Sequence, residues 1–231
     1  MRLTAPRSPV WVFHHIPKCA GTSVRKVLAN WFVMVGDYRK GFSLEYPPAV
    51  DLSSLRSVHC LAGHFELEGY HLHQRYPAVL QSSRFRVFTF LRDPLDARIS
   101  DYYYLRKKNQ PLGNVPLREH ILRSKNWFAS ILSCDETNYE EVLGRYFFIG
   151  IVEDLQRSVD LLAKLTGRDF VRVPNVNSSE RDLQQNELSE ADRRLFRERN
   201  QLDYAIYDYA VRRFRSIADS GSNLEIHSKG V

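Results

Sequence analysis

The run from Val12 to Ser23 constrains the fold of this chain more than any other segment. It passes from an apolar stretch, VFHHI, through Pro17 and Lys18 into small and hydroxyl-bearing residues. An apolar run followed by a turn and an amphipathic segment is typical of a β-strand that feeds a helix. We expect the strand to end at about Ile16 and the helix to start near Gly21. Free backbone N–H groups at such a helix start bind anions, so the turn predicts a site for a phosphate-like group.

The position of the lysine separates this turn from the common nucleotide-binding loop. In the pattern G-x-x-x-x-G-K-[ST] the lysine follows the second glycine, whereas Lys18 precedes Gly21. An ordinary strand-to-helix turn, capped by Thr22 or Ser23, is the alternative interpretation. If the turn binds an anion, the residues that would hold it are Lys18, Cys19, Ala20, Gly21, Thr22 and Ser23.

A second strand-to-helix unit follows farther along the chain. Residues 86–91 alternate between polar and apolar and predict a strand, after which Asp93 is the candidate N-cap and Pro94 the first helical residue. In that helix Ser100 would lie on the side that Arg92 also faces. A guanidinium and a hydroxyl that converge in this way suit a phosphate monoester.

A third segment, residues 58–67, lies between the other two and supplies a candidate base. It is apolar and rich in strand-forming residues, so it predicts a strand whose end carries His64 towards the anion site. Imidazole titrates near pH 6.5 and can therefore take a proton at neutral pH. We expect His64 to be a general base, with Glu66 as the fallback. A purely structural histidine is the alternative interpretation.

Together these segments resemble the sulfotransferases that use 3′-phosphoadenosine 5′-phosphosulfate (PAPS). PKCAGTS resembles their 5′-phosphosulfate loop, RDPLDARISDYYY resembles their 3′-phosphate motif, and GHF matches the second half of H-G-H-[VF] in uronyl and heparan sulfate 2-O-sulfotransferases. The resemblance implies that PAPS binds residues 18–23 and that Arg92 and Ser100 hold its 3′-phosphate. It further implies a hydroxyl acceptor, most like a glycan, and chemistry that requires no metal.

This chain departs from the family pattern at two positions. The internal arginine of the 3′-phosphate motif is replaced by Ala97, with Arg98 beside it. The first histidine of H-G-H is Ala62, so the resemblance predicts no second imidazole beside His64.

In the family a later loop closes over the adenine and the 3′-phosphate. In this chain that loop corresponds to residues 173–181, with the candidates Asn177 and Ser178.

The alternation of strands and helices predicts an α/β fold. Residues 146–152 predict a further buried strand followed by a helix, and a final helix begins near Ser189. We expect a P-loop-like three-layer fold with a central parallel β-sheet flanked by helices and with the ligand at the carboxyl ends of the strands. With 231 residues, 43% of them hydrophobic, the chain can form a single domain. We expect flexible ends at about residues 1–8 and 220–231.

Charge and cysteine content bear on partners and compartment. The formal net charge of +6 suits an anionic nucleotide, and the basic segment 106–125 is either an acceptor-facing patch or a solvated helix face.

Three widely spaced cysteines favour a reducing compartment, and the thiol pKa of Cys19 should fall beside Lys18 and a helix start. Neither a leader-like segment nor a long apolar run occurs in the sequence. We therefore expect a cytoplasmic enzyme without a membrane anchor; its oligomeric state stays open.

Two other functions compete with sulfuryl transfer. The first is a P-loop kinase or NTPase, against which the missing G-K-[ST] and the lack of a clear Mg²⁺-binding aspartate count. The second is a non-catalytic basic protein that binds nucleic acid or an anionic glycan. The tyrosines gather in predicted helices, and Arg92 and Lys18 lie at strand ends rather than across a sheet face, so we do not expect a nucleic-acid partner. The function we predict is transfer from PAPS to a hydroxyl, with His64 as base and Lys18 offsetting the charge on the leaving group.

Overall fold

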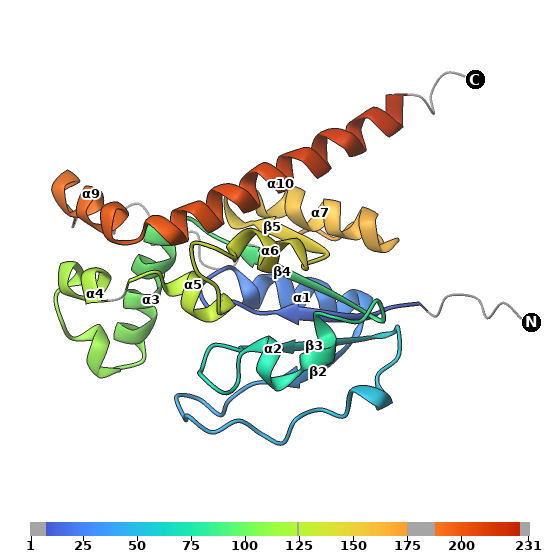
Figure 1. The fold of residues 1–231 in the computed structure, drawn as a ribbon, viewed down its shortest axis with the longest axis horizontal. Helices are drawn as coiled ribbons and strands as arrows, with labels where there is room; N and C mark the ends of the chain where they lie inside the picture. Colours follow the sequence, from blue (N-terminus) through green and yellow to red (C-terminus); the bar gives the residue numbers. More distant parts are fainter. Residues whose placement is uncertain (1–7, 124, 175–187, 227–231) are drawn as a thin grey trace, which may run out of the picture.

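The computed structural model describes residues 8–123, 125–174 and 188–226, with side chains as far as residue 220. Its centre is a five-stranded sheet in the order β2-β3-β1-β4-β5, in which every neighbouring pair is parallel. The strands are β1 (Val10–His14), β2 (Val33–Asp37), β3 (His59–Gly63), β4 (Phe85–Leu91) and β5 (Phe148–Ile151). The α/β fold with a parallel sheet and flanking helices is thereby confirmed (Figure 1).

Helices connect and flank these strands. They are α1 (Gly21–Trp31), α2 (Leu72–Arg75), α3 (Pro94–Lys107), α4 (Leu117–Arg123), α5 (Trp127–Leu132), α6 (Tyr139–Gly144), α7 (Leu155–Thr166), α9 (Glu190–Arg199) and α10 (Gln201–Ile226). In Figure 1 the long helix α10 runs beside α7 and β5, while α3, α4 and α9 gather at one end of the molecule. Within the described residues, no helix combines the length and the apolar character needed to cross a membrane.

The strand order decides where the site can form. All five residues of β1 are buried, and β1 lies between β3 and β4 in the middle of the sheet. His14 pairs with Gly63 at the end of β3, and Phe13 pairs with Phe88 in β4. In a parallel sheet the carboxyl ends of neighbouring strands lie at the same edge. The segments that follow β1, β3 and β4 therefore emerge side by side.

Two hydrophobic clusters stabilise this arrangement. The larger one surrounds the sheet, and its most deeply buried side chains include Phe13, Phe88 and Phe148. A smaller cluster joins α3, α4, α9 and α10, and its members are Leu95, Ile99, Tyr102, Leu117, Ile121, Leu188, Phe196 and Tyr204. Through this second cluster the helical end of the molecule packs against the start of α3, which follows Arg92.

Several boundaries differ from those that the sequence predicts. β1 ends at His14 rather than at about Ile16, because the chain turns there and the Ile16 N–H donates to the His14 carbonyl. Ser189 caps a helix as expected, but that helix ends at Arg199, and the Asn200 side chain bonds back to the Phe196 carbonyl. The predicted single final helix is therefore two. α10 continues to Ile226, into the part of the chain where the sequence predicts a flexible end.

Candidate active site

The turn between β1 and α1 leaves its helix start without a side-chain cap. Ala20 is the N-cap residue and, like Lys18, has a positive φ, 57° and 64° respectively. The N–H groups of Ser23 and Val24 donate to the Ala20 carbonyl. The prediction of a cap by Thr22 or Ser23 is therefore wrong. Because no side chain caps the helix start, its first N–H groups are not bonded by a capping side chain and can bind an anion.

Lys18 reaches from this turn towards α3. Its Nζ lies 4.0 Å from the centroid of the Tyr104 ring, a cation–π contact that joins the turn to α3. Burial lowers the pKa of Lys18 to about 8; the charge of Asp101 acts in the opposite direction and that of Arg92 in the same direction. The charge of Arg92 is therefore close enough to Lys18 to lower its pKa.

Arg92 follows β4 directly, and its side chain is largely buried. Its Nη2 lies 3.9 Å from an oxygen of Asp96 in the first turn of α3. Asp93 caps α3 as the sequence predicts, accepting from the N–H groups of Leu95 and Asp96, and Pro94 is the first helical residue. Ser100 lies half-buried farther along α3. The candidates Asn177 and Ser178 lie outside the described residues.

Arg98, the arginine displaced by one position from the family motif, packs inside the protein. Its guanidinium lies 3.1 Å from Asp101 and 3.2 Å from the His120 ring, and it lies over Trp127 at 4.8 Å. These contacts join α3 to α4 and α5. Arg98 therefore has partners within the protein. These contacts account for an arginine at this position without requiring that it bind a ligand.

His64 follows β3 directly and is held in one tautomer. Its Nδ1 lies 2.6 Å from the backbone oxygen of His15, so Nδ1–H donates and the lone pair lies on Nε2. Burial lowers the pKa of His64 below its usual 6.5, while Glu66 and the bond to His15 act in the opposite direction. A neutral imidazole with a free Nε2 lone pair can accept a proton at neutral pH.

Glu66, the fallback base, is engaged elsewhere. Its carboxylate forms an ion pair with the guanidinium of Arg39, and both side chains are mostly buried. The hydroxyl of Tyr46 donates to the His64 carbonyl and connects this segment to the residues after β2. A carboxylate that is already paired with a cation is a weak base, so the geometry favours His64 over Glu66.

A second imidazole accompanies His64, contrary to what the sequence predicts. The ring of His15 lies against that of His64, with their centroids 4.1 Å apart, and its Nδ1 lies 3.1 Å from the Tyr38 hydroxyl. This imidazole comes from the end of β1 and not from position 62 in β3. The HH pair at the end of the first strand was the available signal, but the sequence does not show which residue of another strand it meets.

The thiol of Cys19 also departs from expectation. Its side chain is buried in the core, and burial raises the pKa of Cys19 to about 12 instead of lowering it. The influence of Lys18 and Arg92 is in the expected direction but is smaller than the effect of burial. Cys19 can thus contribute its backbone N–H to an anion site but has no thiolate at neutral pH.

This burial leads to a prediction about thiol reactivity. Burial raises the pKa of Cys60 and Cys134 as well, so none of the three cysteines forms a thiolate at pH 8. We expect native protein to react with iodoacetamide far more slowly than protein unfolded in urea. Mass spectrometry of timed samples measures the difference; rapid native alkylation of Cys19 would contradict its burial.

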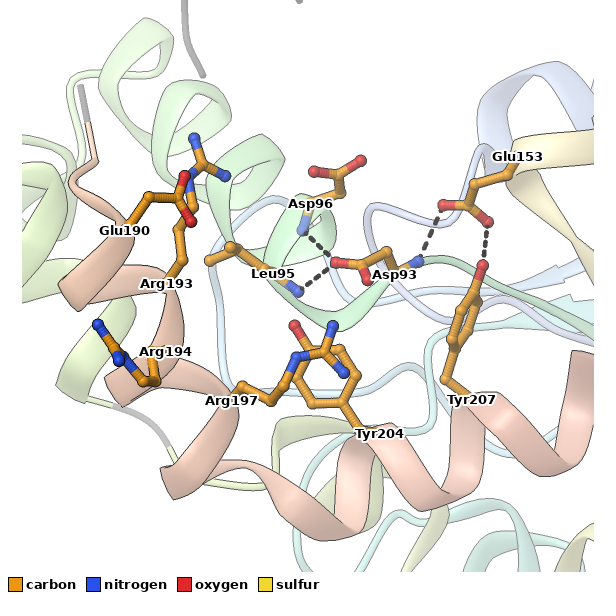
Figure 2. Close-up of a pocket in the computed structure, with 10 residues that line it drawn as sticks. All are labelled: Asp93, Leu95, Asp96, Glu153, Glu190, Arg193, Arg194, Arg197, Tyr204 and Tyr207. Atoms are coloured by element: carbon orange, nitrogen blue, oxygen red, sulfur yellow. Dashed lines mark hydrogen bonds and ion pairs between the residues drawn. The ribbon is translucent and has the colours of Figure 1, made fainter. Parts of the chain in front are cut away.

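A pocket of about 730 Å³ adjoins the turn that carries Arg92 (Figure 2). Asp93 donates its N–H to Glu153, which also accepts from the Tyr207 hydroxyl. The lining residues come from α3, α9, α10 and the short turn after β5; they are Asp93, Leu95, Asp96, Glu153, Glu190, Arg193, Arg194, Arg197, Tyr204 and Tyr207. The sequence pattern does not single out the three arginines of α9 that line this pocket. Four carboxylates balance these three guanidiniums, so the pocket does not select anions by charge alone.

Metal ligands and the basic segment complete the description of the site. No cluster of three or more histidine, cysteine, aspartate or glutamate side chains that could hold a metal ion occurs among the described residues. In the segment 106–125, Arg118 pairs with Asp192 and Arg123 with Glu119. The remaining basic residues at the end of α3, which are Arg106, Lys107 and Lys108, are exposed one turn beyond Tyr104.

Comparisons with known proteins address the fold. No protein-family model matches this chain, and curated proteins give no match. Among solved structures, mouse sulfotransferase SULT7A1 complexed with PAP aligns with a TM-score of 0.55 at 14% identity, over 89% of this chain and 90% of the mouse chain. A sulfotransferase from Alicyclobacillus acidocaldarius aligns with a TM-score of 0.47 at 15% identity, over 88% and 97% of the two chains. The chain thus shares its fold with the mouse sulfotransferase.

Proposed function

We propose that this protein is a sulfotransferase that moves the sulfuryl group of PAPS to a hydroxyl acceptor. The observation that carries the proposal is the junction of base and anion site. His64 at the end of β3 donates Nδ1–H to His15 at the end of β1, 2.6 Å away, and His15 is three residues before Lys18. The imidazole of His64 and the turn with Lys18 and the uncapped helix start therefore follow neighbouring strands of the sheet, which supports the proposal.

In this mechanism each group has one task. The acceptor oxygen attacks sulfur in line, and its proton passes to Nε2 of His64. As the bond between sulfur and the 5′-phosphate oxygen breaks, negative charge develops on that oxygen. The ammonium of Lys18 and the N–H groups of residues 19–22 offset this charge, while the Ser23 N–H is bonded to the Ala20 carbonyl. The products are the sulfated acceptor, 3′-phosphoadenosine 5′-phosphate (PAP) and a proton that His64 releases to solvent.

The far end of the donor is assigned to Arg92 and Ser100. The guanidinium of Arg92 can form two hydrogen bonds with a phosphate, and its charge already acts on Lys18. Asn177 and Ser178 belong to the same proposal as further contacts. The mouse sulfotransferase with the same fold was solved with PAP, which supports a sulfonucleotide as donor.

The acceptor that we propose is a carbohydrate with acidic groups. Tyr104 is 41% exposed beside Lys18, so a ring can stack on it close to the transferred group. The exposed cations of Arg106, Lys107 and Lys108 follow on the same helix and can attract carboxylate or sulfate groups.

A transfer assay tests this function. Purified protein is incubated with radiolabelled PAPS and with uronic-acid glycans, neutral glycans or phenols, and the label on each acceptor is counted. We expect label on the acidic glycans. Calorimetry with PAP and with ATP·Mg²⁺ is run in parallel, because binding of ATP·Mg²⁺ without binding of PAP would instead indicate a kinase or NTPase.

Arg92→Ala tests the grip on the 3′-phosphate. Hydrogen bonds to a charged group contribute about 1.5–3 kcal/mol, so we expect PAP affinity to fall about 10- to 100-fold. Affinity for adenosine 5′-phosphate, which lacks the 3′-phosphate, should change little. Isothermal titration calorimetry measures both. Arg145→Ala, an exposed arginine paired with Glu141, is the control; equal losses for the two nucleotides would reject the role of Arg92.

The pH dependence of kcat/KM for the donor follows from the two shifted groups. His64 must be neutral, and burial lowers its pKa, so the rate should fall only below pH 6.5. Lys18 must be charged, and its pKa of about 8 means that the rate declines as pH rises above that value. We expect a bell-shaped profile whose alkaline limb disappears in Lys18→Arg. An alkaline limb that Lys18→Arg retains would belong to another group.

A further inference from the structure

We propose that His15 is a second catalytic imidazole, which donates a hydrogen bond from Nε2–H to an oxygen of the transferred sulfuryl group. This inference rests on the proposed function and adds a residue to its machinery. The argument depends on the place of the His15 ring, on its tautomer and on its relation to His64.

The ring of His15 lies between the base and the start of α1. It is 8% exposed, and it packs against Phe13 on strand β1, with centroids 5.2 Å apart, as well as against His64. A Cβ atom built on Gly21 would lie 1.6 Å from Nε2 of His15. Nε2 thus occupies the space directly over the first residue of α1, where any larger residue than glycine would collide with it.

Tyr38 is the hydrogen-bond partner of the His15 ring and bears on which nitrogen carries its proton. Burial lowers the pKa of His15 well below 6.5, so the ring is neutral. Burial also raises the pKa of Tyr38 above its usual 10, so its hydroxyl keeps its proton, and the proposal assigns it the donor role towards Nδ1 of His15, 3.1 Å away. A neutral ring that accepts at Nδ1 carries its hydrogen on Nε2. Among the described residues this Nε2–H has no hydrogen-bond partner.

In this assignment the two neighbouring imidazoles, tilted by 37° to each other, hold opposite tautomers. His64 has its hydrogen on Nδ1 and a lone pair on Nε2, whereas His15 has its lone pair engaged by Tyr38 and a hydrogen on Nε2. His64 can accept the proton of the acceptor, and His15 can donate a hydrogen bond without losing its own proton. Its N–H extends the row of backbone N–H groups at the start of α1 towards the sulfuryl oxygens.

The pair PAPS and PAP isolates this contact, because PAP lacks only the sulfuryl group. His15→Phe keeps an aromatic ring of similar size but removes the N–H. A hydrogen bond to a charged group is worth about tenfold or more in affinity, so we expect PAPS to bind about tenfold more weakly while PAP binding stays unchanged. Calorimetry without acceptor measures both affinities. Equal effects on the two nucleotides, or no effect on either, would overturn the role of His15.

Three further variants sharpen the test. His15→Gln retains an N–H donor and should recover part of the PAPS affinity. Tyr38→Phe removes the hydroxyl that the proposal assigns as donor to Nδ1 and should weaken PAPS binding alone; no selective loss there would count against the tautomer. His14→Phe is the matched control, because its ring bonds to Tyr146 instead of facing Gly21. If wild-type protein binds neither nucleotide, the proposed function itself fails, an outcome distinct from failure of the His15 contact.

Discussion

We expect His64→Ala to lower the turnover of PAPS-dependent sulfuryl transfer by about 10²- to 10⁴-fold, the usual contribution of a positioned general base. The reason lies in its geometry: Nδ1 is bonded to the His15 carbonyl, and Nε2 is free to take the acceptor proton. Alanine leaves no group to do so. The affinity for PAP should stay close to that of wild-type protein, because neither Lys18 nor Arg92 bonds to His64. Single-turnover kinetics at saturating donor measures the effect.

Two variants accompany this measurement. His73→Ala removes an exposed histidine and should leave turnover unchanged. Glu66→Gln removes the carboxylate that pairs with Arg39, and we expect it to reduce turnover much less than His64→Ala does. If instead His64→Ala retained near-normal turnover and Glu66→Gln lost it, the base would be Glu66.

Of the variants in these predictions, we expect Arg75→Ala to lower the free energy of unfolding the most. Asp37 at the end of β2 is fully buried, and its carboxylate accepts two hydrogen bonds from Arg75, at 2.6 and 2.8 Å, and one from Tyr76. Removing the guanidinium leaves a buried carboxylate without its cation, which costs about 3–5 kcal/mol. Arg75 also lies beside the rings of Tyr46 and Tyr70, so its loss loosens the segment that contacts His64. Urea unfolding followed by circular dichroism measures the change in the free energy of unfolding.

Two control variants separate the effect of removing the charge at position 75 from that of losing its hydrogen bonds. Arg145→Ala breaks an exposed ion pair with Glu141 and should cost less than about 1 kcal/mol. Arg75→Lys keeps the charge but cannot form both hydrogen bonds, so we expect only partial recovery. A loss for Arg75→Ala as small as that for Arg145→Ala would mean that Asp37 is hydrated or neutral in the folded protein.

Local signals in the sequence predict much of the fold. The turn chemistry around Pro17 and Gly21 predicts the start of α1, and Asp93 with Pro94 predicts the start of α3, since capping and proline preferences act within a few residues. Apolar alternation predicts β4 in the same way. The edge strand β2 has no such signal, because Val33 is exposed and the strand pairs with a neighbouring strand on one side only.

What the sequence could not predict depends on contacts between distant residues. The tilted contact between the His15 and His64 rings results from the pairing of β1 with β3, and the identity of neither residue indicates which residue of the other strand it will lie beside. Cys19 is buried because the turn directs its side chain into the core, which outweighs the nearby cations. The helix break at Asn200 arises where its side chain bonds to the Phe196 carbonyl, a choice that helical periodicity alone does not reveal.

The bond that sets the tautomer of His64 is made by a backbone carbonyl. Any residue at position 15 presents that carbonyl, so mutation at this position cannot remove the bond as long as β1 and β3 keep the register that pairs His14 with Gly63. The pairing of β1 with β3 therefore fixes the orientation of the His64 ring. The side chain at position 15 can change without altering that orientation.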